Sequence, residues 1–131
     1  MVDEDAPYHA HIYYSAVERA AAEALRRDFV RLMDAEQDRP VLFVGRMTDA
    51  PAGPHPIPQF EIHFHARSLA RIVSAIEVSG LRALVHPLTD DDLADHSSLG
   101  RWIGEPLALD LSVLDPPGRN QGVARFGEAD F

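Results

Sequence analysis

Two seven-residue segments, at residues 8–14 and 59–65, alternate apolar and polar side chains with the period of a half-buried β-strand. In the second segment Phe60, Ile62 and Phe64 share one parity, and polar side chains occupy the other. Because successive side chains of a strand point to opposite faces of its sheet, each segment separates an apolar face from a polar one. The sheet that contains both strands therefore buries one face in a core and gathers polar groups on the other.

The other regular segments complete an alternation of strands and helices. The Ser15-x-x-Glu18 capping box starts one helix and Gly80 ends another. In chain order the sequence predicts a strand at 8–14, a helix to about 36, strands at 39–47 and 59–65, a helix at 68–79 and a strand at 81–88. The order β-α-β-β-α-β is that of the ferredoxin-like α+β fold with an antiparallel sheet. Right-handed crossovers place the first and third strands in the middle, the fourth beside the first, and both helices on one face.

The segments between and after these elements are less regular. They comprise a loop at 49–58 with four prolines and a glycine, a polar loop at 89–105 and an apolar stretch at 106–115, which we expect to form an additional C-terminal strand. A length of 131 residues suits one domain spanning 1–131, with residues 1–7 and 116–131 peripheral.

Composition excludes several classes of chemistry. The absence of cysteine and lysine rules out disulfides, thiolate metal ligands, a cysteine nucleophile and a Schiff-base lysine, so any metal must be held by nitrogen and oxygen. A net charge of −9 without a basic stripe argues against nucleic-acid binding. Neither a signal peptide nor a membrane-spanning run is present, which makes a cytoplasmic location the default expectation.

The polar parity of the predicted sheet is rich in histidine. It holds Tyr13, Glu61 and five imidazoles, those of His9, His11, His63, His65 and His86. Side chains at i and i+2 on a strand lie about 6.7 Å apart, and adjacent strands about 4.8 Å apart, so two or three imidazoles can converge on one ion. Two histidines and a carboxylate suit non-heme Fe(II) and oxygen chemistry, while zinc or a polar dimer interface would also explain the pattern.

Several residues outside the strands are candidates for other roles. His55, between two prolines, either sits on a rigid loop that presents it to a substrate or is an exposed side chain of a turn. Asp95 and His96 are either an acid–base pair or a helix cap with an exposed ring. Trp102 either stacks on an aromatic substrate or anchors the core, and Arg82 either grips a substrate carboxylate or lies in solvent.

Five short motifs carry a resemblance to a known family. YHAHIYY (8–14), GPHP (53–56), LVHPLT (84–89), DH (95–96) and WIGEPLALDLSVL (102–114) resemble the DOPA 4,5-dioxygenase family in order and spacing. The resemblance implies a ferredoxin-like fold, a homodimer, and extradiol cleavage of a catechol such as DOPA by non-heme iron and dioxygen. Zinc or manganese is the alternative metal.

The resemblance and the predicted facing of the strands together suggest roles for residues, and Glu61, His63 and Arg82 lie outside the five motifs. His11 and His86 are the preferred metal ligands, with His9 third and Glu61 or His63 as alternatives for that third position. The expected catalytic residues are His96, His55 and Asp95. The expected substrate-binding residues are Glu61, His63, Trp102 and Arg82.

Two other functions remain open from the sequence. One is a non-enzymatic dimeric module that binds a small ligand in a cavity between sheets, which the number of histidines disfavours. The other is a metal-dependent enzyme of another reaction type, such as a hydrolase or an isomerase. The five-motif resemblance favours the dioxygenase, whose partners would be a small aromatic diol and dioxygen.

Overall fold

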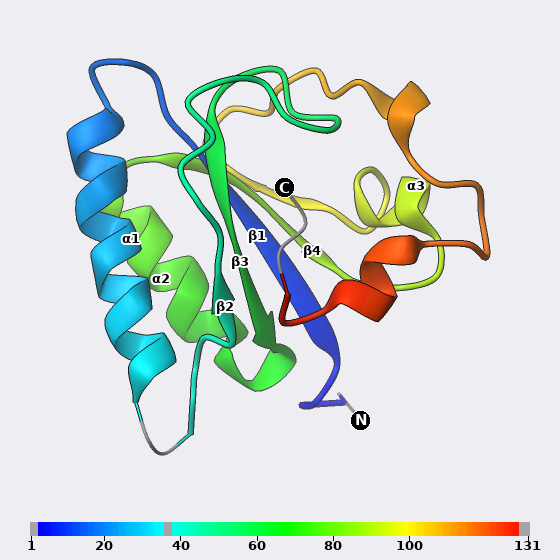
Figure 1. The fold of residues 1–131 in the computed structure, drawn as a ribbon, viewed down its shortest axis with the longest axis horizontal. Coiled ribbons are helices and arrows are strands. Elements are labelled where there is room, and N and C mark those ends of the chain that lie inside the picture. Colours follow the sequence, from blue (N-terminus) through cyan, green and yellow to red (C-terminus); the bar gives the residue numbers. More distant parts are fainter. Residues whose placement is uncertain (1–2, 36–37, 129–131) are drawn as a thin grey trace.

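The structure is a computed structural model that describes residues 3–35 and 38–128 (Figure 1). Its strands are β1 (Pro7–Tyr13), β2 (Phe43–Val44), β3 (Gln59–His65), β4 (Arg82–Pro87) and β5 (Arg101–Ile103). Its α-helices are α1 (Arg19–Asp34), α2 (Leu69–Ser79) and the short α3 (Asp92–Asp95). Short 3₁₀-helices are η1 (Ala66–Ser68), η2 (Leu111–Val113) and η3 (Gln121–Arg125).

The five strands form one antiparallel sheet in the order β2-β3-β1-β4-β5. β1 and β3 lie in the middle and β4 lies beside β1, which confirms the ferredoxin-like α+β prediction. An additional strand, β5, follows β4 along the chain, but at other residues than those expected.

The register of β1 decides what each face of the sheet carries. His9 lies opposite His63 of β3 and His86 of β4, and Ala10 lies opposite Ile62 and Val85. Because paired residues point to the same side of a sheet, the apolar parities of the three strands coincide and so do the polar ones.

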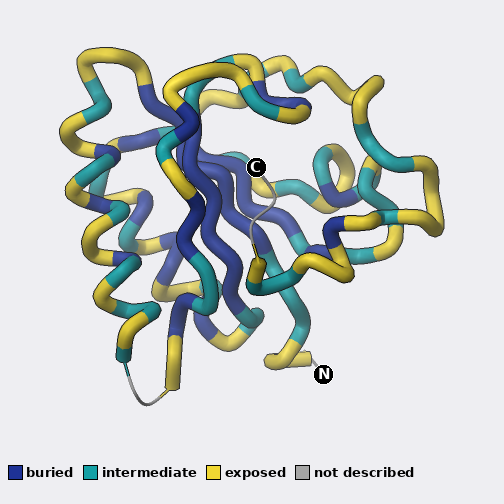
Figure 2. Tube along the Cα trace, in the orientation of Figure 1, coloured by how far each residue is buried: buried dark blue, intermediate teal, exposed yellow. Residues whose placement is uncertain are grey.

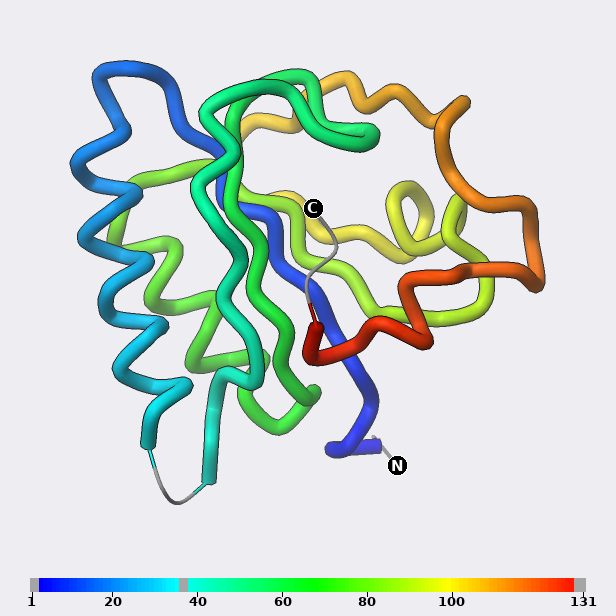
Figure 3. The backbone as a smooth tube through the Cα atoms, in the orientation of Figure 1, coloured from blue at the N-terminus to red at the C-terminus, as the bar shows by residue number. Residues whose placement is uncertain are grey.

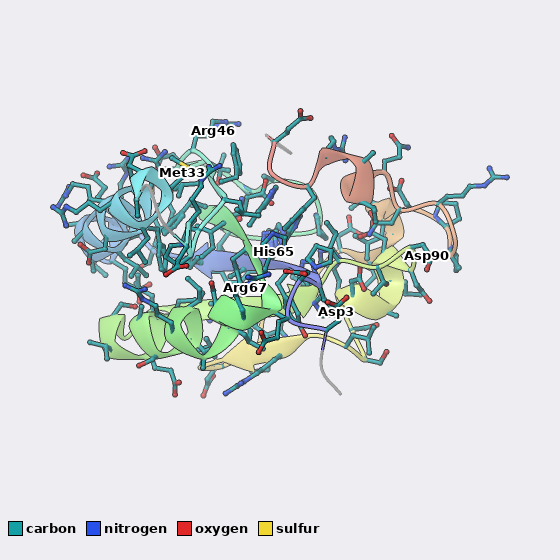
Figure 4. All side chains as sticks on the ribbon, turned by 90° about the horizontal axis from the view of Figure 1, so that it is seen from below. Asp3, Met33, Arg46, His65, Arg67 and Asp90 are labelled. Carbon is teal, nitrogen blue, oxygen red and sulfur yellow. The ribbon has the colours of Figure 1, made fainter. Side chains whose placement is uncertain are left out.

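The apolar face packs against α1 and α2, which lie together on one side of the sheet in Figures 1 and 4. The core they enclose is built from alternate strand residues and the inward stripes of the helices, with Ile12, Phe29, Phe60, Ile62, Phe64, Ile72 and Ile76 fully buried. Burial of this apolar surface is the main driving force for the fold.

The helix-free face is also buried. In Figure 2 the central strands are coloured as buried, and more exposed segments of the chain pass over the side away from α1 and α2. His9, His11 and His63 on this face are at most 3% exposed. Segments of the same chain therefore cover the polar face.

The predicted strand at 106–115 is wrong. β5 lies earlier, at Arg101–Ile103, where Trp102 pairs with Leu84. Residues 106–115 instead contain η2, because the Asp110 side chain accepts hydrogen bonds from the backbone and hydroxyl of Ser112 and so favours a turn. Leu111 and Val113 are 41% and 54% exposed, so the apolar composition of this stretch does not reflect burial.

Two element boundaries also differ from the sequence prediction. α1 begins at Arg19, since Ser15 supplies only the backbone half of the capping box by donating its N–H to Glu18 Oε1. β2 is reduced to Phe43–Val44, although the backbone bonds Leu42 to His63 and Gly45 to Glu61 extend the contact with β3. None of the helices within the described ranges is long and apolar enough to cross a membrane.

Shortening a core side chain tests this packing. Ile62 is completely buried between the sheet and the helices. We expect Ile62→Ala to lower the free energy of unfolding by about 2–5 kcal/mol in urea titrations, because it removes apolar contacts and leaves a cavity. Val78→Ala on the exposed side of α2 is the matched control, and a comparable loss there would contradict the assignment of the core.

Candidate functional site

The polar face of the sheet carries a buried cluster of imidazoles. His9 and His11 come from β1, His63 from β3 and His86 from β4, and the loops add His55 and His96. Neighbouring rings lie close, with centroids 3.9 Å apart for His9 and His63, 4.1 Å for His11 and His55, and 4.3 Å for His86 and His96. The seventh histidine, His65 (labelled in Figure 4), lies at the end of β3 with its Nδ1 2.8 Å from the Asp5 carbonyl.

The two histidines preferred as ligands face each other. His11 Nε2 and His86 Nε2 are 3.0 Å apart. Each ring uses its other nitrogen as a donor, His11 Nδ1 to Gln59 Oε1 at 3.1 Å and His86 Nδ1 to the Pro87 carbonyl at 2.7 Å. Because a neutral imidazole carries one hydrogen, both Nε2 atoms then present lone pairs. Two facing lone pairs repel unless a cation lies near both, so these residues fit a metal ion.

His9 supplies a third donor. One ligand atom from each of His9, His11 and His86 lies within 4.8 Å of the other two, and the three residues are buried. His9 Nε2 has no hydrogen-bond partner among residues 3–35 and 38–128. The groups His11–His55–His96 and His9–Glu61–His63 satisfy the same distance criterion. The buried histidines can therefore bind a metal ion.

Burial keeps the central imidazoles neutral. It lowers the pKa values of His9, His11 and His86 well below 6.5, and the neighbouring imidazoles lower them further. Burial together with His96 lowers the pKa of His55 to about 3. Neutral imidazole is the form that ligates metals, so the electrostatics of the cluster favour coordination over protonation.

The pKa of His96 shifts in the opposite direction. Burial alone would lower its pKa, but hydrogen bonds and charge interactions with Asp92 outweigh that effect and raise it above the ordinary value. His96 Nδ1 lies 2.9 Å from the Asp92 carbonyl and 3.2 Å from Asp92 Oδ1, while Asp92 Oδ2 accepts from the Asp115 N–H. His96 is therefore the histidine of the cluster best suited to carry a proton.

Asp95 does not form the expected pair with His96. Its buried carboxylate accepts hydrogen bonds from the N–H and hydroxyl of Thr89 and from Asn120 Nδ2, and thereby ties two loops together. The carboxylate that contacts His96 is that of Asp92, because residues i and i+4 share one face of the α3 turn whereas adjacent residues do not.

His55 lies where the proline-rich loop meets the cluster. Ala52 and His55 exchange backbone hydrogen bonds, and His55 Nδ1 is 2.7 Å from the Tyr13 hydroxyl. The ring is 2% exposed, which confirms an ordered loop that directs the imidazole inward.

A cavity of about 200 Å³ opens beside the imidazoles. Its polar lining includes His9, His11, His55, His86, Asp92, His96, Asp115, Asn120 and Arg125, and Leu88, Val113 and Leu114 contribute apolar walls. Asp92, Asn120 and Arg125 are site residues that the sequence did not indicate. Asp92 could have been found from the sequence, because it lies four residues before His96. The sequence holds no comparable signal for Asn120 or Arg125.

The comparison with known proteins agrees with this geometry. The model of the Dopa 4,5-dioxygenase family matches residues 8–113, which run from β1 to η2. The chain belongs to the Dopa 4,5-dioxygenase family. The resemblance inferred from the five short motifs is thereby confirmed.

The chain is similar to two fungal proteins. The chain is 36% identical over 114 residues to the DOPA 4,5-dioxygenase of Amanita muscaria, covering 82% of the chain and 49% of that protein. It is 30% identical over 117 residues to an uncharacterized 21.2 kDa protein of Botryotinia fuckeliana, covering 82% and 62%. The chain therefore spans about half to three-fifths of these relatives' lengths.

A solved structure shares the fold. The crystal structure of a "putative dioxygenase" from Nostoc punctiforme superimposes with a TM-score of 0.73 at 32% identity, covering 86% of this chain and 96% of that one. The imidazole cluster thus lies on a sheet that this bacterial protein shares.

None of the four expected substrate-binding residues is among the described residues that line the cavity. Trp102 stacks on Tyr13, with centroids 5.8 Å apart, and reaches the cluster only through the Tyr13–His55 contact. Arg82 pairs with Tyr13 across β1 and β4. Neither is among the described residues that line the cavity, and the same holds for Glu61 and His63, which lie behind His9.

The C-terminal segment is not peripheral, contrary to expectation. Its described part, to residue 128, crosses the helix-free face in Figure 3. Phe126 stacks on His63 with centroids 5.7 Å apart, and the Gly127 N–H donates to His63 Nδ1 at 2.9 Å. This contact could not be read from the sequence, because a short run of mixed residues has no periodicity that identifies a surface to cover.

Acid is expected to destabilise the metal-free protein. A buried imidazole with a lowered pKa stays neutral in the folded state, so the unfolded state binds more protons once the pH falls below about 6.5. Each such group then destabilises by about 1.4 kcal/mol per pH unit. His9, His11, His55 and His86 outnumber His96, whose raised pKa acts in the opposite sense. The free energy of unfolding, measured in urea with a chelator, should fall from pH 6.5 to 5.

His55→Gln provides the control for this prediction. It removes one group whose folded-state pKa is about 3, so the slope should become shallower by about 1.4 kcal/mol per pH unit. A wild-type stability that stays constant over this range would show that the cluster is not held neutral.

Proposed function

We propose that the chain is a metal-dependent extradiol dioxygenase that acts on a catechol such as DOPA or a related small aromatic diol. The observation that carries the proposal is the pair of facing Nε2 atoms of His11 and His86, both in the tautomer that presents a lone pair. His9 completes the proposed ligand set. The reaction type is supported by the family and by the Amanita relative named for it.

Three imidazoles in a chain without cysteine suit Fe(II), and zinc or manganese would accept the same donors. Bound there, a ferrous ion supplies Lewis acidity and the redox capacity to react dioxygen with a catechol. Fe(II) is the proposed metal because the proposed reaction consumes dioxygen.

The cavity has the size and lining for one aromatic ring. An apolar cavity of about 150 Å³ accommodates benzene, so about 200 Å³ leaves room for a ring with two hydroxyls. Leu88, Val113 and Leu114 would bury the ring edge and exclude water while the imidazoles face the hydroxyls. This arrangement holds the reacting groups together in a fixed orientation.

His96 and Asp92 would manage the proton of a substrate hydroxyl. Asp92 holds His96 through Nδ1, which leaves Nε2 to accept the proton, and the adjacent carboxylate stabilises the resulting imidazolium. His55 would serve as a hydrogen-bond donor in the tautomer that carries its hydrogen on Nε2. In that tautomer the Tyr13 hydroxyl, whose pKa is raised by burial, donates to His55 Nδ1.

Removing a proposed ligand tests the metal site. We expect His11→Ala to lose bound iron after anaerobic loading and to abolish oxygen uptake with catechols, because His11 faces both His86 and the cavity. Metal content is measured by mass spectrometry and oxygen uptake with an electrode. His65→Ala should retain both. A His11→Ala protein with full metal content would remove the ligand assignment, and an iron-loaded wild type without oxygen uptake on several catechols would remove the reaction.

Asp92→Asn tests the proton-transfer role separately. It removes the charge that favours protonated His96 while keeping the side-chain shape, so we expect kcat to fall about 100-fold with metal content unchanged. The pH profile of kcat should shift as well. Asp90→Asn, at an exposed position two residues away, should have the wild-type rate and profile. Equal rates in the two variants would exclude Asp92 from catalysis.

A further inference from the structure

A row of polar groups lies behind His9, on the side away from the cavity. Glu61 Oε2 is 3.7 Å from His9 Nδ1 and 3.5 Å from His63 Nε2, and all three side chains are at most 3% exposed. On the far side of His63, the backbone N–H of Gly127 lies 2.9 Å from Nδ1. The row therefore joins the C-terminal segment to a proposed metal ligand through two buried side chains.

The backbone contact fixes the tautomer of His63. A backbone N–H can only donate, so His63 Nδ1 accepts and the single hydrogen of the neutral ring must sit on Nε2. That N–H faces the Glu61 carboxylate. A nitrogen that carries a hydrogen has no lone pair to offer a metal, so His63 is not a ligand while the C-terminal segment is in place.

The carboxylate in turn selects the tautomer of His9. A carboxylate oxygen within 4 Å is an acceptor, so it favours an N–H on the nitrogen that faces it, which is His9 Nδ1. The lone pair of His9 then lies on Nε2, as it does in His11 and His86. A carboxylate behind a ligating histidine is a common way to fix ring orientation and raise ligand basicity.

Ring stacking holds His9 and His63 in parallel planes. His9 and His63 are parallel within 5°, and Phe126 continues the stack on His63 at an interplanar angle of 11°. Phe126 also lies 6.4 Å from His9 between ring centroids. Phe126 and Gly127 lie beyond residue 113, where the family match ends.

We propose that Glu61, His63 and the C-terminal contact at residues 126–127 form a positioning relay for the metal ligand His9. The inference rests on the proposed metal site. Glu61 and His63 then act through His9, rather than by binding the substrate or a metal ion of their own. The C-terminal segment completes the metal centre by fixing the His63 hydrogen on the side of Glu61.

Cobalt binding to the full-length protein tests the relay without using activity. Co²⁺ is titrated into chelator-treated protein, and its affinity is followed by calorimetry and by the visible absorption of the bound ion. We expect Glu61→Gln to weaken binding about 10–100-fold, the usual effect of losing the partner behind a ligating histidine. His63→Phe keeps the stacked ring, removes both nitrogens and should also weaken binding. Glu77→Gln, the same change on the exposed face of α2, should have no effect.

The double variant separates a relay from two independent effects. If Glu61 and His63 act in series, Glu61→Gln combined with His63→Phe should bind Co²⁺ no more weakly than Glu61→Gln alone. If the losses of Co²⁺ affinity in the two single variants multiply in the double variant, the relay is overturned. Wild-type affinity in both single variants would overturn it as well. If the wild type itself binds no Co²⁺, or His11→Ala binds it normally, the proposed metal site fails instead.

The tautomers can be read in the wild-type protein, which needs no variant to fold. Long-range ¹H–¹⁵N correlation spectra of the metal-free protein should show the His63 hydrogen on Nε2 and the His9 hydrogen on Nδ1. A His63 ring with its hydrogen on Nδ1 would overturn the proposal. The same spectra of Glu61→Gln should show His9 losing its preference for Nδ1–H while the fold remains native.

Discussion

The register that holds β1 between β3 and β4 is the constraint on which both the core and the site depend. Pairing His9 with His63 and His86 also pairs Ala10 with Ile62 and Val85. A slip of one residue would turn imidazoles toward α1 and α2 and expose apolar side chains on the opposite face. Burial of the core therefore selects the same register that brings the histidines together, and the site needs no separate device to align its strands.

Once aligned, the imidazoles are controlled by groups that bind their Nδ1 atoms. Five rings are held in this way: His11 by Gln59, His86 by the Pro87 carbonyl, His55 by Tyr13, His96 by Asp92 and His63 by Gly127. The chemical character of each partner decides where the ring hydrogen lies. Acceptors at His11 and His86 free Nε2 for a metal, while the backbone donor at His63 places a hydrogen there. One residue type thus fills different roles within a few ångströms.

The chain encloses this cluster with its own loops. The proline-rich loop, the segment around α3 and the C-terminal segment pass over the face that α1 and α2 leave free, and together they bury the histidines. Exclusion of water strengthens the electrostatic interactions among these groups and lowers the pKa values of the central rings. The Dopa 4,5-dioxygenase family match covers the sheet, the proline-rich loop and the segment around α3. The C-terminal segment lies beyond residue 113, where the match ends.

The sequence by itself determined the first four strands, the two long helices, their order and which side chains share a face, because the periods of two and 3.6 residues are local properties of the backbone. Those periods place His9, His11, His63 and His86 on the polar face, and five short motifs identify the family. Only the tertiary structure decided that Asp92 rather than Asp95 contacts His96, that residues 106–115 turn instead of pairing, and that Phe126 and Gly127 cover His63. These outcomes depend on which distant segments meet and on which hydrogen bonds compete at the meeting point, and neither leaves a periodic signal in the chain.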